Sequence, residues 1–186
     1  MAKKSSSVGK ALRKDRPAKT AGKKRLSFSG SLSLSSAFPE VQDLARTGQH
    51  AAAIDLTSQK LSAESDTALR MTLLGLRCDS YIALGKFDLA EADANAMHEL
   101  ALSGDPELKI LALMYQASVQ LVKGRLVEAT QTATQAVAQA RALKTPNPYL
   151  LARCLYILGE CYKSSGNYEN AITAAKEAIP LFEMTG

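Results

Sequence analysis

Two histidines and three cysteines are the side chains of this chain that most readily bind metals or act as nucleophiles. His50 and His98 lie in different parts of the chain, and neither has a cysteine or second histidine at metal-site spacing. Cys78, Cys154 and Cys161 form no Cys-x-x-Cys pair, and three cysteines cannot all pair in internal disulfides. The sequence therefore predicts no metal site and favours a reducing compartment.

Other patterns that carry enzyme chemistry are missing from the sequence. The Gly-Lys pairs at residues 9–10, 22–23 and 85–86 lack the remaining residues of a phosphate-binding P-loop, and no Gly-x-Ser-x-Gly segment occurs. Several acids have the spacing of solvated helix faces, and we expect them to be exposed: Glu91, Asp93, Glu169 and Glu177. We therefore expect no catalytic residues and no cofactor in these 186 residues.

Positive charge is concentrated at the start of the chain. Residues 1–26 contain ten Lys or Arg side chains against one acid, whereas the remaining 160 residues contain 13 basic and 17 acidic side chains. A like-charged segment with little apolar surface favours disorder, so residues 1–36 are predicted to form a disordered, basic, serine-rich arm. Its cations are Lys3, Lys4, Lys10, Arg13, Lys14, Arg16, Lys19, Lys23, Lys24 and Arg25.

Several roles are open for this arm. Clustered cations attract nucleic acid or an anionic surface in a salt-sensitive way, although no aromatic side chain suited to base stacking precedes Phe28. Solubility with loose electrostatic contact is the simpler reading, and nuclear or organellar targeting stays an alternative. No apolar run has the length of a membrane span, so we expect no transmembrane segment and a cytoplasmic protein.

A pattern centred on glycine repeats four times along the rest of the chain. The glycines are separated by 37, 39 and 42 residues, and an alanine follows each of them five residues later. A bulky or ring-bearing side chain follows each glycine by two residues. A repeat of this length indicates stacked supersecondary units. The glycines are Gly48, Gly85, Gly124 and Gly166, and the alanines are Ala53, Ala90, Ala129 and Ala171.

Helical periodicity surrounds each glycine, so each unit is predicted to be two helices joined by a glycine in the left-handed conformation. The sequences Asp105-Pro106 and Asn147-Pro148 are typical of helix starts. Pro180 lies inside the last expected helix and is predicted to kink or shorten it. The expected helices pair residues 39–47 with 49–63, 66–84 with 86–102, 106–123 with 125–143, and 148–165 with 168–183.

The fourth unit contains the most specific motif. It holds Leu158-Gly159, Tyr162 and Gly166-x-Tyr168, followed by alanines at 171, 175 and 178. These residues resemble a tetratricopeptide repeat, with Leu155 where that family often has Trp. The second and third units match less fully, and the first is degenerate. The spacing exceeds the family's usual 34 residues, which resembles the extended repeats of bacterial signalling and regulatory proteins.

The resemblance implies an all-α fold for residues 37–186. The expected architecture is a right-handed superhelical array, or α-solenoid, of about four helix-turn-helix units at residues 38–63, 66–103, 106–144 and 148–184. In the family, the first helix of each pair lines a concave groove. The family pattern then places partner-binding side chains at Asp79, Ile82, Met114, Ser118, Arg153, Tyr156, Glu160 and Lys163.

This expected groove is apolar in its middle and charged toward the last unit, which suits an amphipathic helix or an extended peptide. The resemblance thus predicts a non-catalytic scaffold for protein–protein interaction. Family members that bind the terminal carboxylate of chaperones use Asn, Lys and Arg on the inner wall. The matching positions here are acidic or neutral, which disfavours that ligand: Asp79, Ser118 and Glu160.

The last expected helix carries apolar side chains where a repeat array usually needs a polar cap. We therefore expect the chain to be the N-terminal part of a larger signalling or regulatory protein, or this last face to dock on a partner or on a second copy of the chain. An alternative is a regulatory region of a nucleotide cyclase, diguanylate cyclase or transcription regulator whose catalytic or DNA-binding part is absent here. A further alternative is nucleic-acid or anionic-surface binding through the basic arm.

Overall fold

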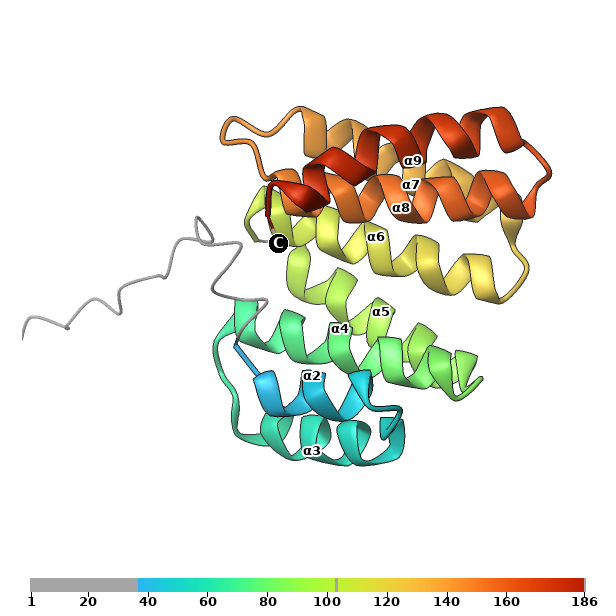
Figure 1. Cartoon of the computed structure of the whole chain (residues 1–186). Coiled ribbons are helices and arrows are strands. Elements are labelled where there is room, and N and C mark those ends of the chain that lie inside the picture. The colour runs from blue at the N-terminus through green and yellow to red at the C-terminus, as the bar shows by residue number, and fades with distance from the viewer. Residues whose placement is uncertain (1–36, 103, 186) are drawn as a thin grey trace, which may run out of the picture.

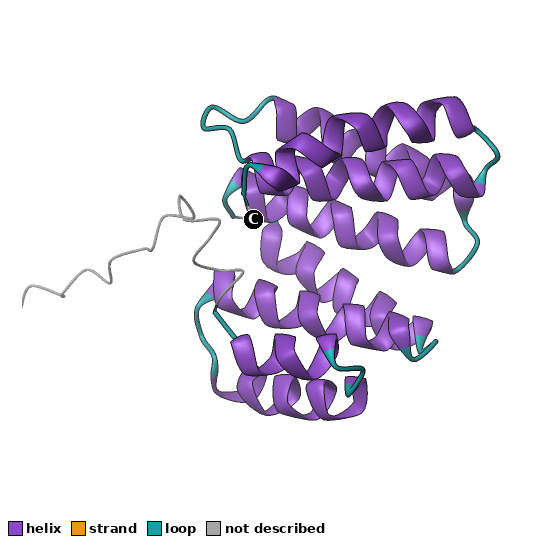
Figure 2. Ribbon diagram, in the orientation of Figure 1, coloured by secondary structure: helices purple, strands orange, loops and turns teal. Residues whose placement is uncertain are grey.

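The computed structural model describes residues 37–102 and 104–185, and within these residues all regular structure is helical (Figure 2). The basic arm predicted for residues 1–36 lies outside the described residues. The helices are α2 (Pro39–Arg46), α3 (His50–Ala63), α4 (Thr67–Ala83), α5 (Phe87–Ala101), α6 (Pro106–Val122), α7 (Leu126–Arg141), α8 (Pro148–Ser164) and α9 (Tyr168–Glu183).

Consecutive helices pack as four antiparallel pairs, and each pair packs against the next (Figure 1). The first helices of successive pairs also contact one another, as α4 contacts α6 and α6 contacts α8. The predicted all-helical array of stacked pairs is therefore confirmed. Each predicted helix end lies within two residues of the observed one.

The repeated glycines end the first helix of each pair. All four have a positive φ: 79° at Gly48, 68° at Gly85, 77° at Gly124 and 77° at Gly166. At Gly124 the chain leaves α6 with two backbone hydrogen bonds. Arg125 N–H donates to the Gln120 carbonyl at 2.9 Å, and Gly124 N–H donates to the Leu121 carbonyl at 3.0 Å. The same pair of bonds recurs at the other three glycines, which is the Schellman form of helix end.

Replacing Gly124 by alanine is expected to lower the free energy of unfolding by about 1–2 kcal/mol, because a Cβ disfavours the left-handed conformation. No atom lies within 4 Å of the added Cβ, so the loss comes from the backbone conformation and not from a clash. Urea denaturation followed by circular dichroism measures this loss.

The matched control for this prediction is Gly159→Ala, inside α8. The Cβ there would lie at an ordinary 3.6 Å from the Ala174 Cβ. Alanine favours a helix over glycine, so this variant should be neutral or more stable by up to about 1 kcal/mol. Equal losses at both positions would contradict the conformational explanation.

Side-chain caps begin the first helix of three pairs. Asp66 accepts hydrogen bonds from Ala68 N–H and Leu69 N–H, at 2.9 and 3.0 Å. The predicted caps at Asp105 and Asn147 are confirmed, since they accept from the second and third helical N–H groups respectively. Asn147 also donates to the Glu107 carboxylate at 2.9 Å, which ties the start of α8 to the start of α6.

Small side chains allow the two helices of each pair to approach closely. Ala53, Ala90 and Ala129 have no exposed surface, as expected for the alanine five residues after each glycine. Ala171 is only half-buried, because α9 has no following helix in the described residues. Pro180 does not end α9, which continues to the expected Glu183, so of the two predicted effects the shortening does not occur.

Among the helices in residues 37–102 and 104–185, none combines the length and the hydrophobicity that a membrane-spanning helix requires.

Candidate functional site

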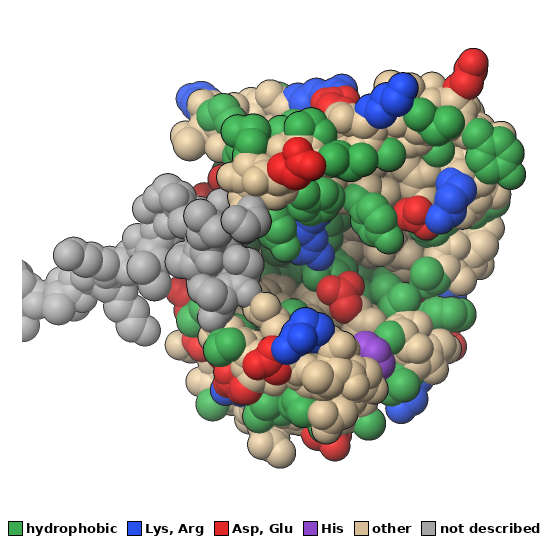
Figure 3. All heavy atoms as spheres, viewed as in Figure 1, with side chains coloured by type: hydrophobic (Ala, Val, Ile, Leu, Met, Phe, Trp, Pro, Cys, Tyr) green, Lys and Arg blue, Asp and Glu red, His purple; other side chains and the backbone are tan. Residues whose placement is uncertain are grey.

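A hollow opens on the face of the molecule seen in Figure 3, near the first helices of the pairs. Hydrophobic side chains line much of it, and both a basic and an acidic side chain are visible on its wall. Two predicted groove residues have the exposure expected of a wall position, since Asp79 is exposed and Arg153 is half-buried. Asp79 and Arg153 are therefore candidates for the wall of this hollow.

Three side chains from three successive first helices form a connected row. Tyr115 on α6 donates its hydroxyl hydrogen to Asp79 Oδ2 on α4, at 3.1 Å. Arg153 Nη2 on α8 donates to the same Tyr115 hydroxyl oxygen, at 3.0 Å. The guanidinium also lies 5.3 Å from the centre of the Tyr115 ring and 6.0 Å from that of Tyr149. We call Asp79, Tyr115 and Arg153 the wall row.

The charged groups of the wall row are surrounded by protein atoms in the hollow, although Asp79 keeps solvent-accessible surface. Burial raises the pKa of the Asp79 carboxyl, although Arg153 and the Tyr115 hydrogen bond act in the opposite direction. Burial acts to lower the pKa of Arg153, but the attraction of Tyr115 and Asp79 outweighs it, and the pKa of the guanidinium is raised. Arg153 therefore stays cationic.

The position of Tyr115 depends on a glycine in the preceding pair. A Cβ on Gly75 would lie 2.6 Å from the Tyr115 hydroxyl oxygen and 2.7 Å from ring atom Cζ, closer than real contacts. Only glycine at position 75 leaves this space on α4. On the other side, the Tyr149 ring meets Phe182 of α9 edge to face, with centroids 6.1 Å apart. The wall row is thus supported from α4 through to α9.

The remaining predicted groove residues divide into three groups. Tyr156 is 57% exposed, and Glu160 forms a surface ion pair with Lys163 one turn later on α8. Ile82 and Ser118 are half-buried, and Ile82 packs against the core. Met114 is only 2% exposed and lies in the core, so it offers no surface to a ligand. The structure brings together Asp79 with Arg153, and Glu160 with Lys163.

Tyr115 is the wall-row residue that the sequence pattern does not single out. It follows Met114 by one residue, and a one-residue step turns the side chain by about 100° around a helix. The sequence feature that could have indicated it is a tyrosine in one first helix together with a glycine in the preceding first helix. To infer their contact, one must also know how far α6 is shifted along its axis relative to α4, and the sequence does not supply this shift.

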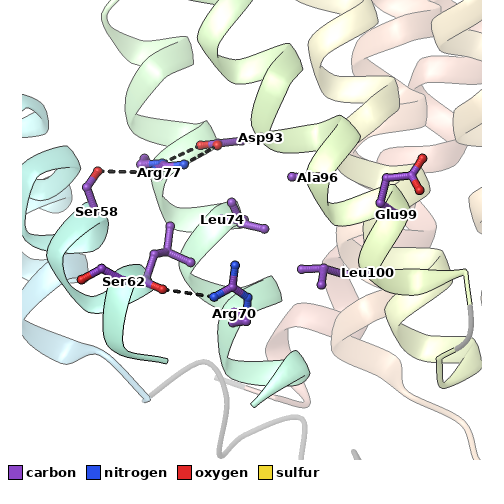
Figure 4. Close-up of a pocket in the computed structure, with 10 residues that line it drawn as sticks. Ser58, Ser62, Arg70, Leu74, Arg77, Asp93, Ala96, Glu99 and Leu100 are labelled. Carbon is purple, nitrogen blue, oxygen red and sulfur yellow. Dashed lines mark hydrogen bonds and ion pairs between the residues drawn. The ribbon is translucent and has the colours of Figure 1, made fainter. Parts of the chain in front are cut away.

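A second hollow of about 640 Å³ lies between α3, α4 and α5 (Figure 4). Its cations already have partners within the protein. Arg77 donates to both carboxylate oxygens of Asp93, at 2.9 and 2.6 Å, and to Ser58 Oγ at 2.9 Å. Arg70 donates to the backbone carbonyls of Leu61 and Glu64, at 3.1 and 2.9 Å. These bonds join three helices, so this cleft is best explained as part of the packing.

Asp93 corrects one expectation from the sequence. Its position in α5 predicted an exposed, solvated acid, but the residue is 4% exposed and paired with Arg77. Glu91 and Glu177 do lie at the surface, where Glu91 pairs with Lys123 at 2.6 Å and Glu177 with Arg141 at 2.7 Å. Asp93 was expected to be exposed because charged residues usually lie on the solvent face of a helix, whereas here it lies on the face of α5 that packs against α4.

The three cysteines are free and buried. Burial raises the pKa of each thiol, to about 11 for Cys161 and about 12 for Cys154. A thiol with such a pKa holds little reactive thiolate at neutral pH. In the part of the chain that the structure describes, no three His, Cys, Asp or Glu side chains gather as a metal site would require.

No curated protein matches the chain. The family model described as tetratricopeptide repeat matches residues 108–184, which run from the first turn of α6 to just past the end of α9. The same glycine turn and helix pairing continue into the two preceding pairs. Residues 108–184 therefore match the tetratricopeptide repeat family, which is consistent with a tetratricopeptide repeat protein.

Proposed function

We propose that the hollow on the inner side of the array binds a segment of a partner protein, as an extended peptide or an amphipathic helix. The observation that carries this proposal is the wall row, which holds one cation and one acid at fixed positions across α4, α6 and α8. Tetratricopeptide repeats are protein-interaction scaffolds, so a preorganised polar row on the first helices supports a binding role here.

The chemistry of the wall row indicates what the partner segment offers. A guanidinium has five N–H groups, and one of those on Arg153 donates to Tyr115. The others can donate to a carboxylate or carbonyl of the partner, while Asp79 can accept from a hydroxyl, amide or ammonium group. Two aromatic rings hold the guanidinium in place, so binding costs little side-chain entropy.

We also propose a cellular compartment for this scaffold. Three free, buried cysteines support a reducing compartment such as the cytoplasm. We also propose that the chain is part of a larger signalling or regulatory protein, because its repeat spacing resembles that of the extended repeats in such proteins.

Affinity purification with the chain as bait tests the binding surface through Arg153→Glu and Arg153→Gln. Partners that use the wall row should be retained roughly tenfold less by Arg153→Glu, because their acidic group would meet a carboxylate in an enclosed site. Arg153→Gln keeps a donor for Tyr115 without the charge, and should cause a smaller loss. Quantitative mass spectrometry of the retained proteins measures both effects.

Lys144→Glu is the matched control, since it reverses one charge on an exposed residue in the link between α7 and α8. Thermal unfolding of each bait by circular dichroism confirms that the variants are folded. A set of partners retained equally by Lys144→Glu and by both Arg153 variants would overturn the proposed binding surface.

A further inference from the structure

An apolar stripe runs along the outer face of α9. It consists of Tyr168, Ile172, Ala175 and Ile179, and we call it the α9 stripe. Tyr168 is 65% exposed, Ile172 is 54% exposed and Ile179 is 55% exposed, and Ala175 is exposed as well. Four apolar positions on one face of a helix are normally buried against another element.

The preceding pair shows what covers these positions inside the array. Counted from the repeat glycine, the α9 stripe corresponds to Leu126, Thr130, Ala133 and Val137 of α7. In α7 these residues are half-buried or buried, with Ala133 at 1% and Val137 at 3% exposure, and α7 packs against α8. The stripe therefore has the composition and register of a helix-packing surface.

We propose that a second copy of this chain covers the α9 stripe, with the two α9 helices antiparallel across a two-fold axis. The stripe residues are spaced by four, three and four positions, and this spacing reads the same in both directions. Tyr168 of one copy then lies opposite Ile179 of the other, and Ile172 lies opposite Ala175. Each large side chain of the inner layers then meets a small one, which allows the two helices to approach closely.

The charges beside the stripe fit the antiparallel arrangement. Glu169 and Lys176 each follow a stripe residue by one position, so they lie on the same edge of the stripe, and both are exposed. In an antiparallel helix pair, this edge of one helix faces the same edge of the other helix. Glu169 of each copy then lies beside Lys176 of the other, which gives two symmetric ion pairs.

A parallel arrangement fits the structure poorly. It would bring this charged edge against the opposite edge of the stripe, formed by Ala171 and Ala178. Ala178 is 4% exposed and Ala171 half-buried, because that side of α9 packs against α8. The opposite edge is therefore largely covered within each copy, whereas the edge with Glu169 and Lys176 is exposed. An isologous pairing of this kind closes on itself as a dimer.

Sedimentation velocity and light scattering over a dilution series of the full chain test this dimer. We expect the mass to rise from 19.9 kDa towards twice that value with increasing concentration. Ile172→Asp should weaken the association by roughly 100-fold or more, because it places a carboxylate in an apolar layer. Asn170→Asp adds the same charge to an exposed position of α9 outside the stripe and should leave the mass profile unchanged.

A charge exchange tests the antiparallel register itself. Lys176→Glu should weaken the dimer by roughly fivefold, because two carboxylates then face each other at each end. Combining Lys176→Glu with Glu169→Lys restores opposite charges and should restore the association. A monomeric chain at all concentrations, including one whose stripe binds an amphipathic helix of another protein, would overturn the proposal. A dimer unaffected by Lys176→Glu would overturn the antiparallel register.

Discussion

Replacing Asp93 by alanine is expected to lower the free energy of unfolding by about 3 kcal/mol. Asp93 accepts two hydrogen bonds from Arg77, at 2.9 and 2.6 Å, where its own side chain is 6% exposed and that of Arg77 is 20% exposed. Removing the carboxylate leaves the guanidinium partly buried without its counter-charge. The expected loss is at the lower end for buried pairs, because Arg77 keeps some contact with water and its bond to Ser58.

Urea denaturation of Asp93→Ala, Asp93→Asn and the double variant Arg77→Leu, Asp93→Leu measures this effect. Asp93→Asn keeps an acceptor and should lose less than Asp93→Ala. The double variant removes both charges, so it should regain much of the loss. A double variant as unstable as Asp93→Ala would contradict the explanation by an unpaired charge, and a loss below about 0.5 kcal/mol for Asp93→Ala would place this pair with ordinary surface pairs.

The fold could be predicted from the sequence because the features that end and begin its helices are local. A single glycine with positive φ ends each first helix, and a single Asp or Asn caps the start of three of these first helices, so neighbouring residues alone specify both. Pro180 shows the limit of local reasoning. Its ring costs α9 one backbone hydrogen bond, but Leu181 and Phe182 beyond it pack against the core and keep the helix intact.

The candidate site was only partly predictable for a different reason. The family pattern assigns residues to the inner wall by their position around one helix, and it places Asp79 and Arg153 there. Contacts between helices also depend on axial offset, which decides that Tyr115 lies over Gly75 and reaches both residues. The burial of Asp93 could not be predicted for the same reason, since it depends on the axial offset between α4 and α5.

The two proposed surfaces follow from one property of a stacked array. Each helix pair offers one side to the pair before it and the other to the pair after it, while its first helices share the inner wall. The wall row uses the shared side, and the α9 stripe uses the side that no described residue covers. Variants of Arg153 should therefore change partner binding without changing the proportion of dimer in solution. Variants of Ile172 should lower the proportion of dimer without changing partner binding.

Replacing Leu155 by alanine is expected to lower the free energy of unfolding by roughly 2–5 kcal/mol. Leu155 is 2% exposed in α8 and belongs to the core cluster that joins the pairs, at the position where the family often has Trp. Truncation to alanine removes apolar contact and leaves a cavity that the packed neighbours fill only in part. Urea denaturation followed by circular dichroism measures the loss.

Tyr156→Ala, at the next residue of the same helix, is the matched control. Tyr156 is 57% exposed, so its truncation should change the free energy of unfolding by less than about 0.5 kcal/mol. Because a step of about 100° separates the two side chains, one belongs to the core and the other faces solvent. Similar losses at both residues would contradict this division, whereas a folded Tyr156→Ala that retains fewer partners would support a place for Tyr156 in the binding surface.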